Sequence, residues 1–498
     1  MNVDQAGPQS TTYQEAIDFL YGRINYEKIG HTTYSAANYR LDRMRRLLEL
    51  IGNPQSRYRI LHVAGTKGKG TTSIVAAHLL SNCGFRVGLF SSPHLLRLEE
   101  RIQCDGVPCT AETLIGLVDR VRNAAELLER EGGGRPTFFE MTTAMGMLHF
   151  AEFGCDIAVL EVGLGGRLDS TNVCQPDVAI ITSISFDHQA QLGNTITSIA
   201  NEKAGIIKSK IPVVCSARDL EARQVIEQKA KNLDAPFYLI DRDFSVQWER
   251  CLPPATATPD SSRPIFAKIH YQPKFAPSVI GNSTWKLPIL GRHQADNVAA
   301  ALTAIDLLFS SLTSQPPAPD KLAACANLQP AFSTLQLPAR LQPVASAPVQ
   351  LIDTAHNPAS ISATLDALDD HFPSQERTIV FASSRDKEFA KMLRLLILRC
   401  QRLVLTAYQN NPRALALPDL VDAANRISIE CLEEESKLAP SKTAPTPLGK
   451  ILYADHPAAA WELALQDTNS SSIICGTGSF FLAAELLPLF DTSGGRLQ

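Results

Sequence analysis

The sequence predicts an α/β protein built from two doubly wound domains. Short apolar runs, typical of buried parallel strands, alternate with helical patterns in both halves of the chain. A glycine-rich stretch follows one of these runs and opens a helix. The 498 residues, 45% hydrophobic and 20% charged, are enough for more than one domain of an ordinary globular protein.

Composition excludes several classes of partner. The net charge of −4 gives no reason to expect nucleic acid or an anionic membrane. No run of about 18 apolar residues predicts a membrane span, and Met1–Tyr13 lacks the apolar core of a signal peptide. The 11 cysteines are scattered without a CxxC pair, which favours reduced, buried thiols over a disulfide framework. We therefore expect a cytoplasmic protein.

The first half alternates helices and strands by these patterns. Apolar residues at helical spacing predict two helices within residues 14–51, one over 111–131 and one over Met141–Phe153. A further helix, Ser73–Cys83, is ended by Gly84. Continuous apolar runs predict the strands Ile60–Val63, Arg86–Phe90, Ile157–Val162 and Val178–Ile184.

The second half repeats this rhythm. Strand-like runs separated by helical patterns predict a second doubly wound domain, with strands Val349–Ile352, Thr378–Ala382, Arg402–Thr406 and Ser472–Cys475. Residues 250–286, rich in Pro, Ser and Thr, predict an enlarged surface hairpin or loop. Residues 432–447 predict an exposed loop.

The stretch after the first strand predicts a phosphate cradle. It reads Gly65-Thr66-Lys67-Gly68-Lys69-Gly70-Thr71. Glycines let backbone N–H groups approach oxyanions, the helix N-terminus adds partial positive charge, and Lys69 adds a full one. The spacing departs from the common G-x-x-x-x-G-K-[ST] loop, which indicates a particular sub-type. The alternative is a glycine-rich turn that binds nothing.

Polar side chains at the ends of other predicted strands are candidate ligands. Ser92 lies in a loop that could bind a metal or phosphate or be a simple Ser-Pro turn. Glu161 is a carboxylate that burial makes costly unless it meets a cation such as Mg²⁺. His188 follows an Asp and is a candidate ligand or proton carrier.

Two further candidates left alternatives open. Lys203 lies in a small, apolar setting, so it either lies away from a metal or is converted by CO₂ to an anionic carbamate. Thr137 and Glu140 fit a capping box at a helix start. The same residues, with Phe138 and Phe139 between them, could line a pocket for a flat heterocycle.

Motifs along nearly the full length resemble one family. Beyond the phosphate loop they are Ser91-Ser92-Pro93-His94-Leu95, Leu160-Glu161-Val162-Gly163-Leu164-Gly165-Gly166-Arg167-Leu168-Asp169, Phe186-Asp187-His188, Glu202-Lys203-Ala204-Gly205-Ile206, Gly291-Arg292-His293-Gln294-Ala295-Asp296-Asn297, Pro338-Ala339-Arg340-Leu341-Gln342, Asp353-Thr354-Ala355-His356-Asn357-Pro358 and Gly476-Thr477-Gly478-Ser479. In this order they resemble the folylpolyglutamate synthase/dihydrofolate synthase family of the Mur ligase superfamily. Lys67 departs from it, since the family usually has Asn there.

The resemblance implies a fold and an activity. The fold is an N-terminal P-loop-type ATPase domain over residues 1–335 and a smaller Rossmann-like domain over 336–498. The activity is ATP-dependent ligation of L-glutamate to dihydropteroate, to reduced folates or to both, through an acyl phosphate. The resemblance implies small-molecule substrates and a monomer, without nucleic-acid or membrane partners.

It also implies roles for individual residues. Catalysis would involve Lys69, His188 and Lys203. ATP would be bound by Thr66, Lys67, Gly68, Lys69, Gly70, Thr71, Asn297, Arg340, Asp353 and His356. The pterin would contact Thr137, Phe138, Phe139, Glu140, Leu168, Asp169 and Ser170. Two Mg²⁺ ions would be held, one by Ser92 and Glu161, the other by His188 and a carbamylated Lys203.

Two other readings compete with this one. The first is another Mur-type amide ligase that acts on a cell-wall precursor. The second is a catalytically silent nucleotide-binding protein on the same fold.

Overall fold

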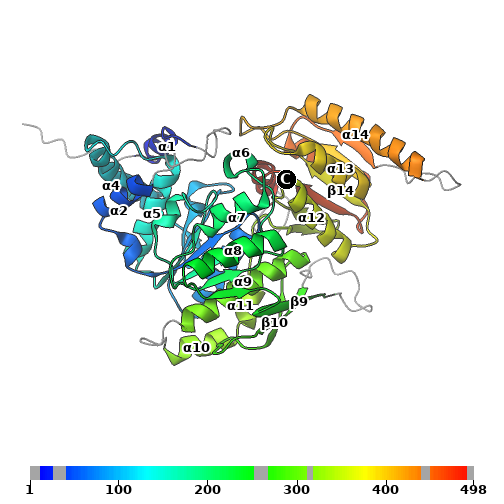
Figure 1. Ribbon diagram of the computed structural model, residues 1–498. Coiled ribbons are helices and arrows are strands. Elements are labelled where there is room, and N and C mark those ends of the chain that lie inside the picture. The colour runs from blue at the N-terminus through cyan, green and yellow to red at the C-terminus, as the bar shows by residue number, and fades with distance from the viewer. Residues whose placement is uncertain (1–11, 26–40, 252–266, 311–317, 439–448, 491–498) are drawn as a thin grey trace, which may run out of the picture. The chain divides into compact units, whose positions relative to one another are not determined.

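The computed structural model describes residues 12–25, 41–251, 267–310, 318–438 and 449–490. The chain forms two compact units, which are described separately (Figure 1). The first comprises Met1–Val246, Tyr271–Ser283 and Asp296–Ala331, and the second comprises Gln247–His270, Thr284–Ala295 and Phe332–Gln498. The single division predicted at 335/336 did not anticipate the two short segments that cluster with the second unit.

An eight-stranded sheet in the order β4-β3-β2-β5-β1-β6-β7-β8 forms the centre of the first unit. Its strands are β1 (Arg59–Ala64), β2 (Val87–Phe90), β3 (Ile102–Cys104), β4 (Val107–Pro108), β5 (Ile157–Glu161), β6 (Val178–Ile181), β7 (Val213–Cys215) and β8 (Phe237–Leu239). Six of them are parallel, whereas β3 pairs antiparallel with β2 and β4. The four strands predicted in this half are confirmed. The carboxyl ends of β1, β5 and β6 meet at one edge, where ligands bind in such sheets.

The helices between residues 13 and 333 are α1 (Tyr13–Tyr21), α2 (Leu41–Leu50), α3 (Lys69–Asn82), α4 (Ala111–Arg130), α5 (Phe138–Phe153), α6 (Gln189–Leu192), α7 (Ile196–Ala204), α8 (Leu220–Asn232), α9 (Arg292–Ser310), α10 (Pro319–Ala326) and α11 (Gln329–Ser333). Helix α3 begins earlier than the predicted Ser73. Gly68, with φ of 87°, occupies its N-cap, so Gly70 and Thr71 lie within the first turn. None of the described helices combines the length and apolarity needed to cross a membrane.

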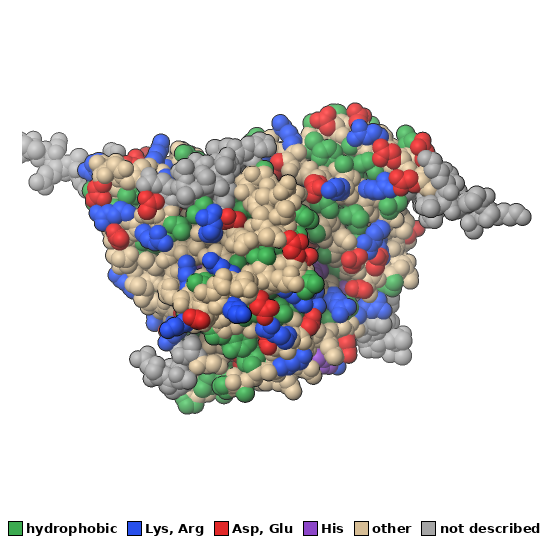
Figure 2. All heavy atoms as spheres, in the orientation of Figure 1, with side chains coloured by type: hydrophobic (Ala, Val, Ile, Leu, Met, Phe, Trp, Pro, Cys, Tyr) green, Lys and Arg blue, Asp and Glu red, His purple; other side chains and the backbone are tan. Residues whose placement is uncertain are grey.

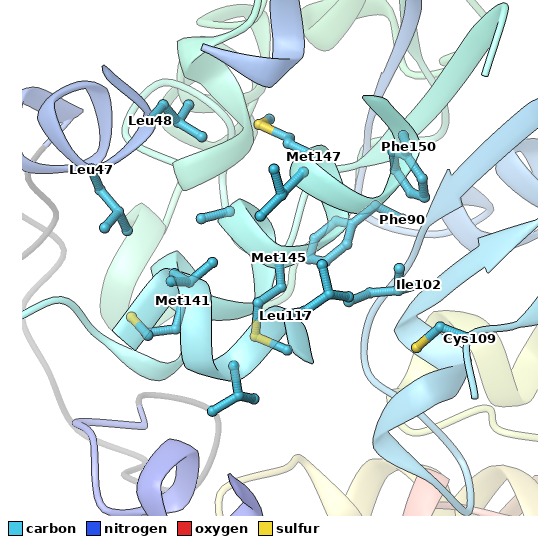
Figure 3. Close-up of a cluster of buried hydrophobic side chains, with 14 of the residues drawn as sticks. Leu47, Leu48, Phe90, Ile102, Cys109, Leu117, Met141, Met145, Met147 and Phe150 are labelled. Carbon is cyan, nitrogen blue, oxygen red and sulfur yellow. The ribbon is translucent and has the colours of Figure 1, made fainter. Parts of the chain in front are cut away.

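The apolar faces of α2, α4 and α5 bury one hydrophobic core against β2 and β3. Leu47, Leu117 and Met145 from the helices contact this core together with Phe90 and Ile102 from the strands (Figure 3). Because these residues recur at helical spacing in the sequence, the three helices were predictable without the structure.

A three-stranded sheet lies where the sequence predicted a hairpin or loop over 250–286. Its strands are β9 (Phe244–Arg250), β10 (Ala267–Pro273) and β11 (Ser283–Leu287), in the order β11-β10-β9. Residues 252–266 of the predicted loop lie outside the described part of the chain.

The second unit contains a six-stranded sheet in the order β12-β13-β17-β14-β15-β16. Its elements are β12 (Gln342–Ser346), β13 (Val349–Ile352), α12 (Pro358–His371), β14 (Arg377–Phe381), α13 (Phe389–Arg399), β15 (Arg402–Leu405), α14 (Leu417–Leu438), β16 (Lys450–Tyr453), α15 (Pro457–Leu465), β17 (Ile473–Thr477) and α16 (Phe480–Leu486). Only β12 is antiparallel among these strands. The four predicted strands are confirmed, and the sequence missed β12 and β16.

One predicted loop in this unit is wrong in part. The exposed loop expected over 432–447 is helical up to Leu438, because α14 continues an apolar face of Leu420, Ala424, Ile427 and Cys431. Residues 439–448 lie outside the described residues.

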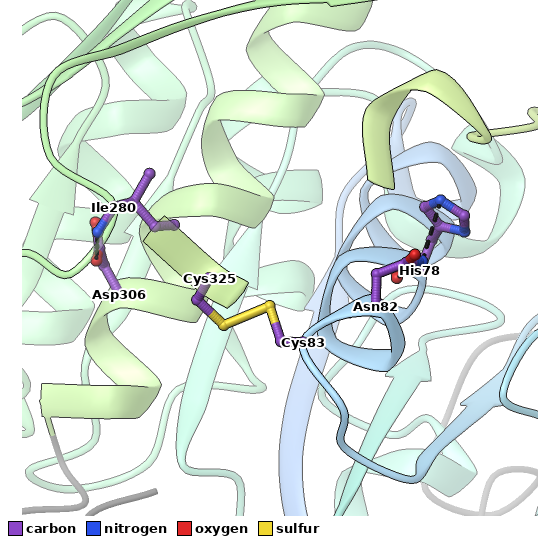
Figure 4. Close-up of a disulfide and its surroundings, with 6 residues drawn as sticks. All are labelled: His78, Asn82, Cys83, Ile280, Asp306 and Cys325. Carbon is purple, nitrogen blue, oxygen red and sulfur yellow. Dashed lines mark hydrogen bonds between the residues drawn. A yellow bond between two sulfur atoms is a disulfide. The ribbon is translucent and has the colours of Figure 1, made fainter. Parts of the chain in front are cut away.

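The expectation of reduced thiols does not hold for two of the cysteines. Cys83 at the end of α3 and Cys325 in α10 form a disulfide across 242 residues (Figure 4). The two positions are too far apart in sequence for any local spacing to indicate their pairing. The other nine cysteines form no disulfide. Elsewhere the surface matches its composition, since Figure 2 shows basic and acidic side chains interspersed over the viewed face.

The disulfide can be tested by counting thiols. Alkylation of the denatured, unreduced protein should modify nine cysteines and leave a Cys83–Cys325 cross-linked peptide for mass spectrometry. Reduction before alkylation should expose all 11. Eleven alkyl groups without reduction would contradict the pairing.

Candidate active site

The phosphate loop leaves β1 at Ala64 and enters α3 at Lys69, in the predicted order of strand, glycine-rich loop and helix. It lies against the segment that follows β6: the Thr66 N–H donates to the Ser183 carbonyl over 2.7 Å, and the Ser185 N–H donates to Thr66 Oγ1 over 3.1 Å. The contact is close at Gly65, where a Cβ atom would lie 1.8 Å from Thr182 Oγ1. Glycine at this position therefore allows the two backbones to meet.

Gly68 makes the second close approach in the loop. A Cβ atom there would lie 2.1 Å from Oδ1 of Asn297 on α9. Thr72 Oγ1 also donates to the Asn297 carbonyl over 3.3 Å. Sequence motifs 229 positions apart are thus brought together, with Asn297 seated on the first turn of α3. Thr71 in this turn is buried, and Gly70 precedes it within the helix.

Two lysines donate to a single carbonyl oxygen of the loop. Lys69 Nζ donates to the Gly65 carbonyl over 3.2 Å, and Lys203 Nζ donates to the same oxygen over 2.9 Å. Lys203 comes from α7 and is 5% exposed. Burial first, and the nearby Lys69 charge second, lower the pKa of Lys203 to about 7, although Asp187 and Asp169 oppose this shift. Near neutral pH a substantial fraction of this amine is uncharged.

The departure at Lys67 has a structural partner. Lys67 Nζ pairs with Asp187 Oδ2 at 2.7 Å, which ties the phosphate loop to the loop that carries His188. His188 adopts a left-handed conformation with φ of 50°, and its Nε2 lies 3.9 Å from Asp187 Oδ1. Its side chain is 44% exposed, so the ring is accessible to a ligand.

Glu161 and Ser92 come together at the ends of neighbouring strands. Glu161 ends β5 opposite Val63 of β1 and is 5% exposed. Its Oε2 accepts the Ser92 N–H over 3.3 Å, so the two residues are neighbours. The sequence missed what holds this loop in place. The Glu100 carboxylate accepts N–H groups from Leu95, Leu96 and Arg97 over 2.7–2.9 Å.

The donor set fits magnesium in its chemistry. A buried carboxylate and a serine hydroxyl supply the hard oxygen ligands that Mg²⁺ accepts. The uncharged form of a lysine amine reacts with CO₂ to give a carbamate. The carbamate would supply a further oxygen ligand. No group of three or more His, Cys, Asp or Glu side chains gathers as a metal site among the described residues. The two predicted ion sites therefore depend on Ser92 and Lys203 as well as on Glu161 and His188.

The Thr137–Glu140 segment forms the capping box of α5. Thr137 Oγ1 accepts the Glu140 N–H, and the Glu140 carboxylate accepts the Thr137 N–H over 2.7 Å. Glu140 also forms a buried ion pair with Arg43 at 2.8 Å, which no sequence pattern indicated. Phe138 is fully buried and stacks on Tyr21, which assigns it a core role.

Phe139 is the aromatic ring of this segment that stays partly exposed. It packs edge-on against Phe90 and lies over Gly163, where a Cβ atom would come within 2.5 Å of the ring. Nearby, the buried Asp169 carboxylate accepts the N–H groups of Gly163 and Leu164 over 3.1 and 2.9 Å. Burial raises the pKa of Asp169. Asp169 thus shapes the glycine-rich loop, flanked by a buried Leu168 and a half-buried Ser170.

The remaining predicted residues belong to the second unit. Asp353, which follows β13, is buried and accepts the N–H groups of Leu341 and Ala355 and the Thr364 hydroxyl over 2.8–3.0 Å. Arg340 donates to the Thr354 hydroxyl and lies 5.0 Å from the centroid of Phe480. The His356 ring donates to the Thr354 carbonyl over 2.9 Å and packs on the same Phe480. The three predicted residues share neighbours, and Asp353 orders the segment that carries Arg340.

Gly68→Ala should be far more harmful than another glycine replacement at a similar backbone angle. Gly106 has φ of 78° but open space around its Cβ position, whereas Gly68 faces Asn297. We expect Gly68→Ala to lower the free energy of unfolding by about 1–3 kcal/mol more than Gly106→Ala, measured by urea denaturation. Equal losses would contradict the close packing of the phosphate loop on α9.

Two known protein families match this chain. Residues 63–305 match the Mur ligase middle domain, and residues 339–480 match the Mur ligase glutamate ligase domain. The dihydrofolate synthase/folylpolyglutamate synthase of Bacillus subtilis is 32% identical over 417 residues, which cover 83% of this chain and 89% of that protein. The folylpolyglutamate synthase of Lacticaseibacillus casei is 35% identical over 74% of this chain and 81% of that protein.

A solved structure agrees over nearly the whole length. The Mycobacterium tuberculosis folylpolyglutamate synthase complexed with ADP superposes with a TM-score of 0.76 and 26% identity, covering 96% of this chain and 98% of that one. The chain belongs to the folylpolyglutamate synthase/dihydrofolate synthase family of Mur ligases.

Proposed function

We propose that this enzyme is an ATP-dependent ligase that joins L-glutamate to the carboxylate of dihydropteroate, of a reduced folate, or of both. Family membership supports an ATP-dependent ligase. One observation supports the assignment to this site: Lys69 and Lys203 both donate to the Gly65 carbonyl. This shared acceptor joins the phosphate loop to a buried lysine whose pKa is about 7. The names of the matched relatives supply the folate substrate class.

The chemistry follows from the weak reactivity of a carboxylate. Transfer of the γ-phosphoryl group of ATP to that carboxylate gives an acyl phosphate and ADP. The glutamate amine then attacks the acyl carbon, an amide bond forms, inorganic phosphate leaves and the amine loses a proton. Such transfer depends on positioning and charge neutralisation more than on covalent help from the protein.

The phosphate loop supplies that positioning. Backbone N–H groups at the start of α3 point toward the oxyanions, and Lys69 and Lys67 add positive charge. Thr66, Gly68, Gly70 and Thr71 complete this set in our proposal. Asn297, packed on Gly68, and Arg340, Asp353 and His356 of the second unit are the proposed further ATP contacts.

Two magnesium ions would neutralise the phosphates and the acyl carboxylate when bound. Ser92 and Glu161 are the residues proposed to hold one, and His188 with a carbamylated Lys203 the other. Formation of the carbamate joins the neutral Lys203 amine to CO₂ with loss of one proton. Lys203 reaches the uncharged form more readily than an exposed lysine because its pKa is about 7.

For the pterin ring, we propose contacts from Phe139 and the loop of Leu168, Asp169 and Ser170. Phe139 offers a partly exposed aromatic surface. Thr137, Phe138 and Glu140 would hold Phe139 in position, since Thr137 and Glu140 form the capping box and Phe138 lies in the core. We further propose that the enzyme works as a monomer, since a single chain supplies all of these residues. We also propose that it works in the cytoplasm, as expected from its composition.

The function is tested by phosphate release from ATP with Mg²⁺ and L-glutamate, run in parallel with dihydropteroate and with tetrahydrofolate. We expect glutamate-dependent release with at least one of them, and release with both would show a bifunctional enzyme. Lys203→Ala should lower turnover by about 10²-fold or more while ATP binding persists. Lys229→Ala, an exposed lysine on α8, is the matched control.

Silence with both pterin substrates despite ATP binding would contradict the proposal. Turnover of uridine-nucleotide muropeptides instead would move the assignment to the cell-wall ligases. Normal turnover of Lys203→Ala would remove the carbamate from the mechanism without removing the ligase activity.

A further inference from the structure

A second cavity opens at the other edge of the first unit's sheet. Its volume is about 750 Å³, and residues at the starts of the parallel strands line it. Arg59 opens β1, Arg86 directly precedes β2, and Ile157 opens β5. The phosphate loop follows the opposite, carboxyl end of β1. This cavity is therefore separate from the site described above.

The cavity wall is strongly cationic. Four lining side chains carry positive charge, Arg57, Arg59, Arg86 and Lys321, against one carboxylate, Asp156. Concave surfaces lined by one sign of charge concentrate their field and attract counter-ions.

Two of these cations have no ion-pair partner among the described residues. Arg59 is paired with Asp177 at 2.7 Å and Lys321 with Asp156 at 3.6 Å. Asp156 additionally accepts the backbone N–H of Arg86 over 3.0 Å. Within the described part of the chain, no ion pair involves the guanidinium of Arg57 or of Arg86. Guanidinium groups are suited to the paired oxygens of carboxylates and phosphates.

The wall is also held in place before any ligand binds. Lys321 Nζ lies 4.2 Å from the ring centroid of Phe85, which stacks on Phe309 at 5.6 Å. The Cys83–Cys325 disulfide ties α10, which carries Lys321, to the segment that leads into Phe85 and Arg86 (Figure 4). A preformed wall reduces the ordering cost of binding.

We propose that this cavity binds a small polyanion through its phosphate or carboxylate groups, independently of the phosphate loop. The guanidiniums of Arg57 and Arg86 bind the anionic oxygens directly. Arg59 and Lys321 add to the positive field, and Phe85 forms the apolar side of the cavity.

The test is isothermal titration calorimetry of the full-length protein with inorganic pyrophosphate and, separately, with citrate. The buffer is free of Mg²⁺. The titration is run in a Lys69→Ala background, so that binding at the phosphate loop is weakened. We expect at least one probe to bind, and its affinity to fall as KCl is added. Binding of pyrophosphate alone identifies a phosphate ligand, citrate alone a carboxylate ligand, and both an anion site that accepts either.

Adding Arg57→Ala and Arg86→Ala should weaken that binding about tenfold or more. Arg130→Ala is the matched control, because Arg130 is exposed on α4 and donates to its own helix. Arg57→Gln alone, at an exposed position, keeps the test valid if the combined variant unfolds. Absence of binding for both probes, or equal affinity with and without the two arginines, would overturn the proposal.

Discussion

The carbonyl oxygen of Gly65 accepts hydrogen bonds from two lysines, and the site depends on this shared acceptor. Burial makes the charged form of Lys203 costly through desolvation, and the Lys69 ammonium on the same oxygen adds repulsion. The physical response is a pKa for Lys203 near 7, whereas an exposed lysine keeps its proton far above neutral pH. One backbone oxygen thus links the phosphate loop, the helix α7 and the protonation state of a buried amine.

This arrangement requires strand order and close backbone contact together. Strands β5 and β6 flank β1 in the sheet. Glu161 at the end of β5, Gly65 after β1 and the segment 182–188 after β6 therefore lie at the same edge. Glycines at 65 and 68 let Thr182 and Asn297 approach to distances that a Cβ atom would forbid. The Lys67–Asp187 pair then ties the loop to the neighbour of His188. Backbone geometry thus places the glycine-rich loop, a carboxylate and a histidine together.

Much of this was predictable because its signals are local. The phosphate loop, the capping box at Thr137 and the buried strands follow from spacing within a few residues. Interactions between distant positions were not predictable without the fold: the Arg43–Glu140 pair, the Cys83–Cys325 disulfide and the Gly68–Asn297 contact join segments about 100 or more residues apart. Strands β12 and β16 were missed because they lie at the two edges of their sheet, and their mostly exposed or half-buried residues do not form the continuous apolar run that marks a buried strand. Resemblance to a family placed Lys203 in the site, while burial and its neighbours explain its chemistry.

The most direct test of this account is the titration of Lys203 itself. The ¹³Cε resonance of lysine-labelled protein, assigned by its loss in Lys203→Arg, can be followed against pH in CO₂-free buffer. Burial and the nearby Lys69 charge predict a midpoint near pH 7. A midpoint close to the ordinary lysine value of about 10.4 would show that the amine stays charged at neutral pH and would contradict the account.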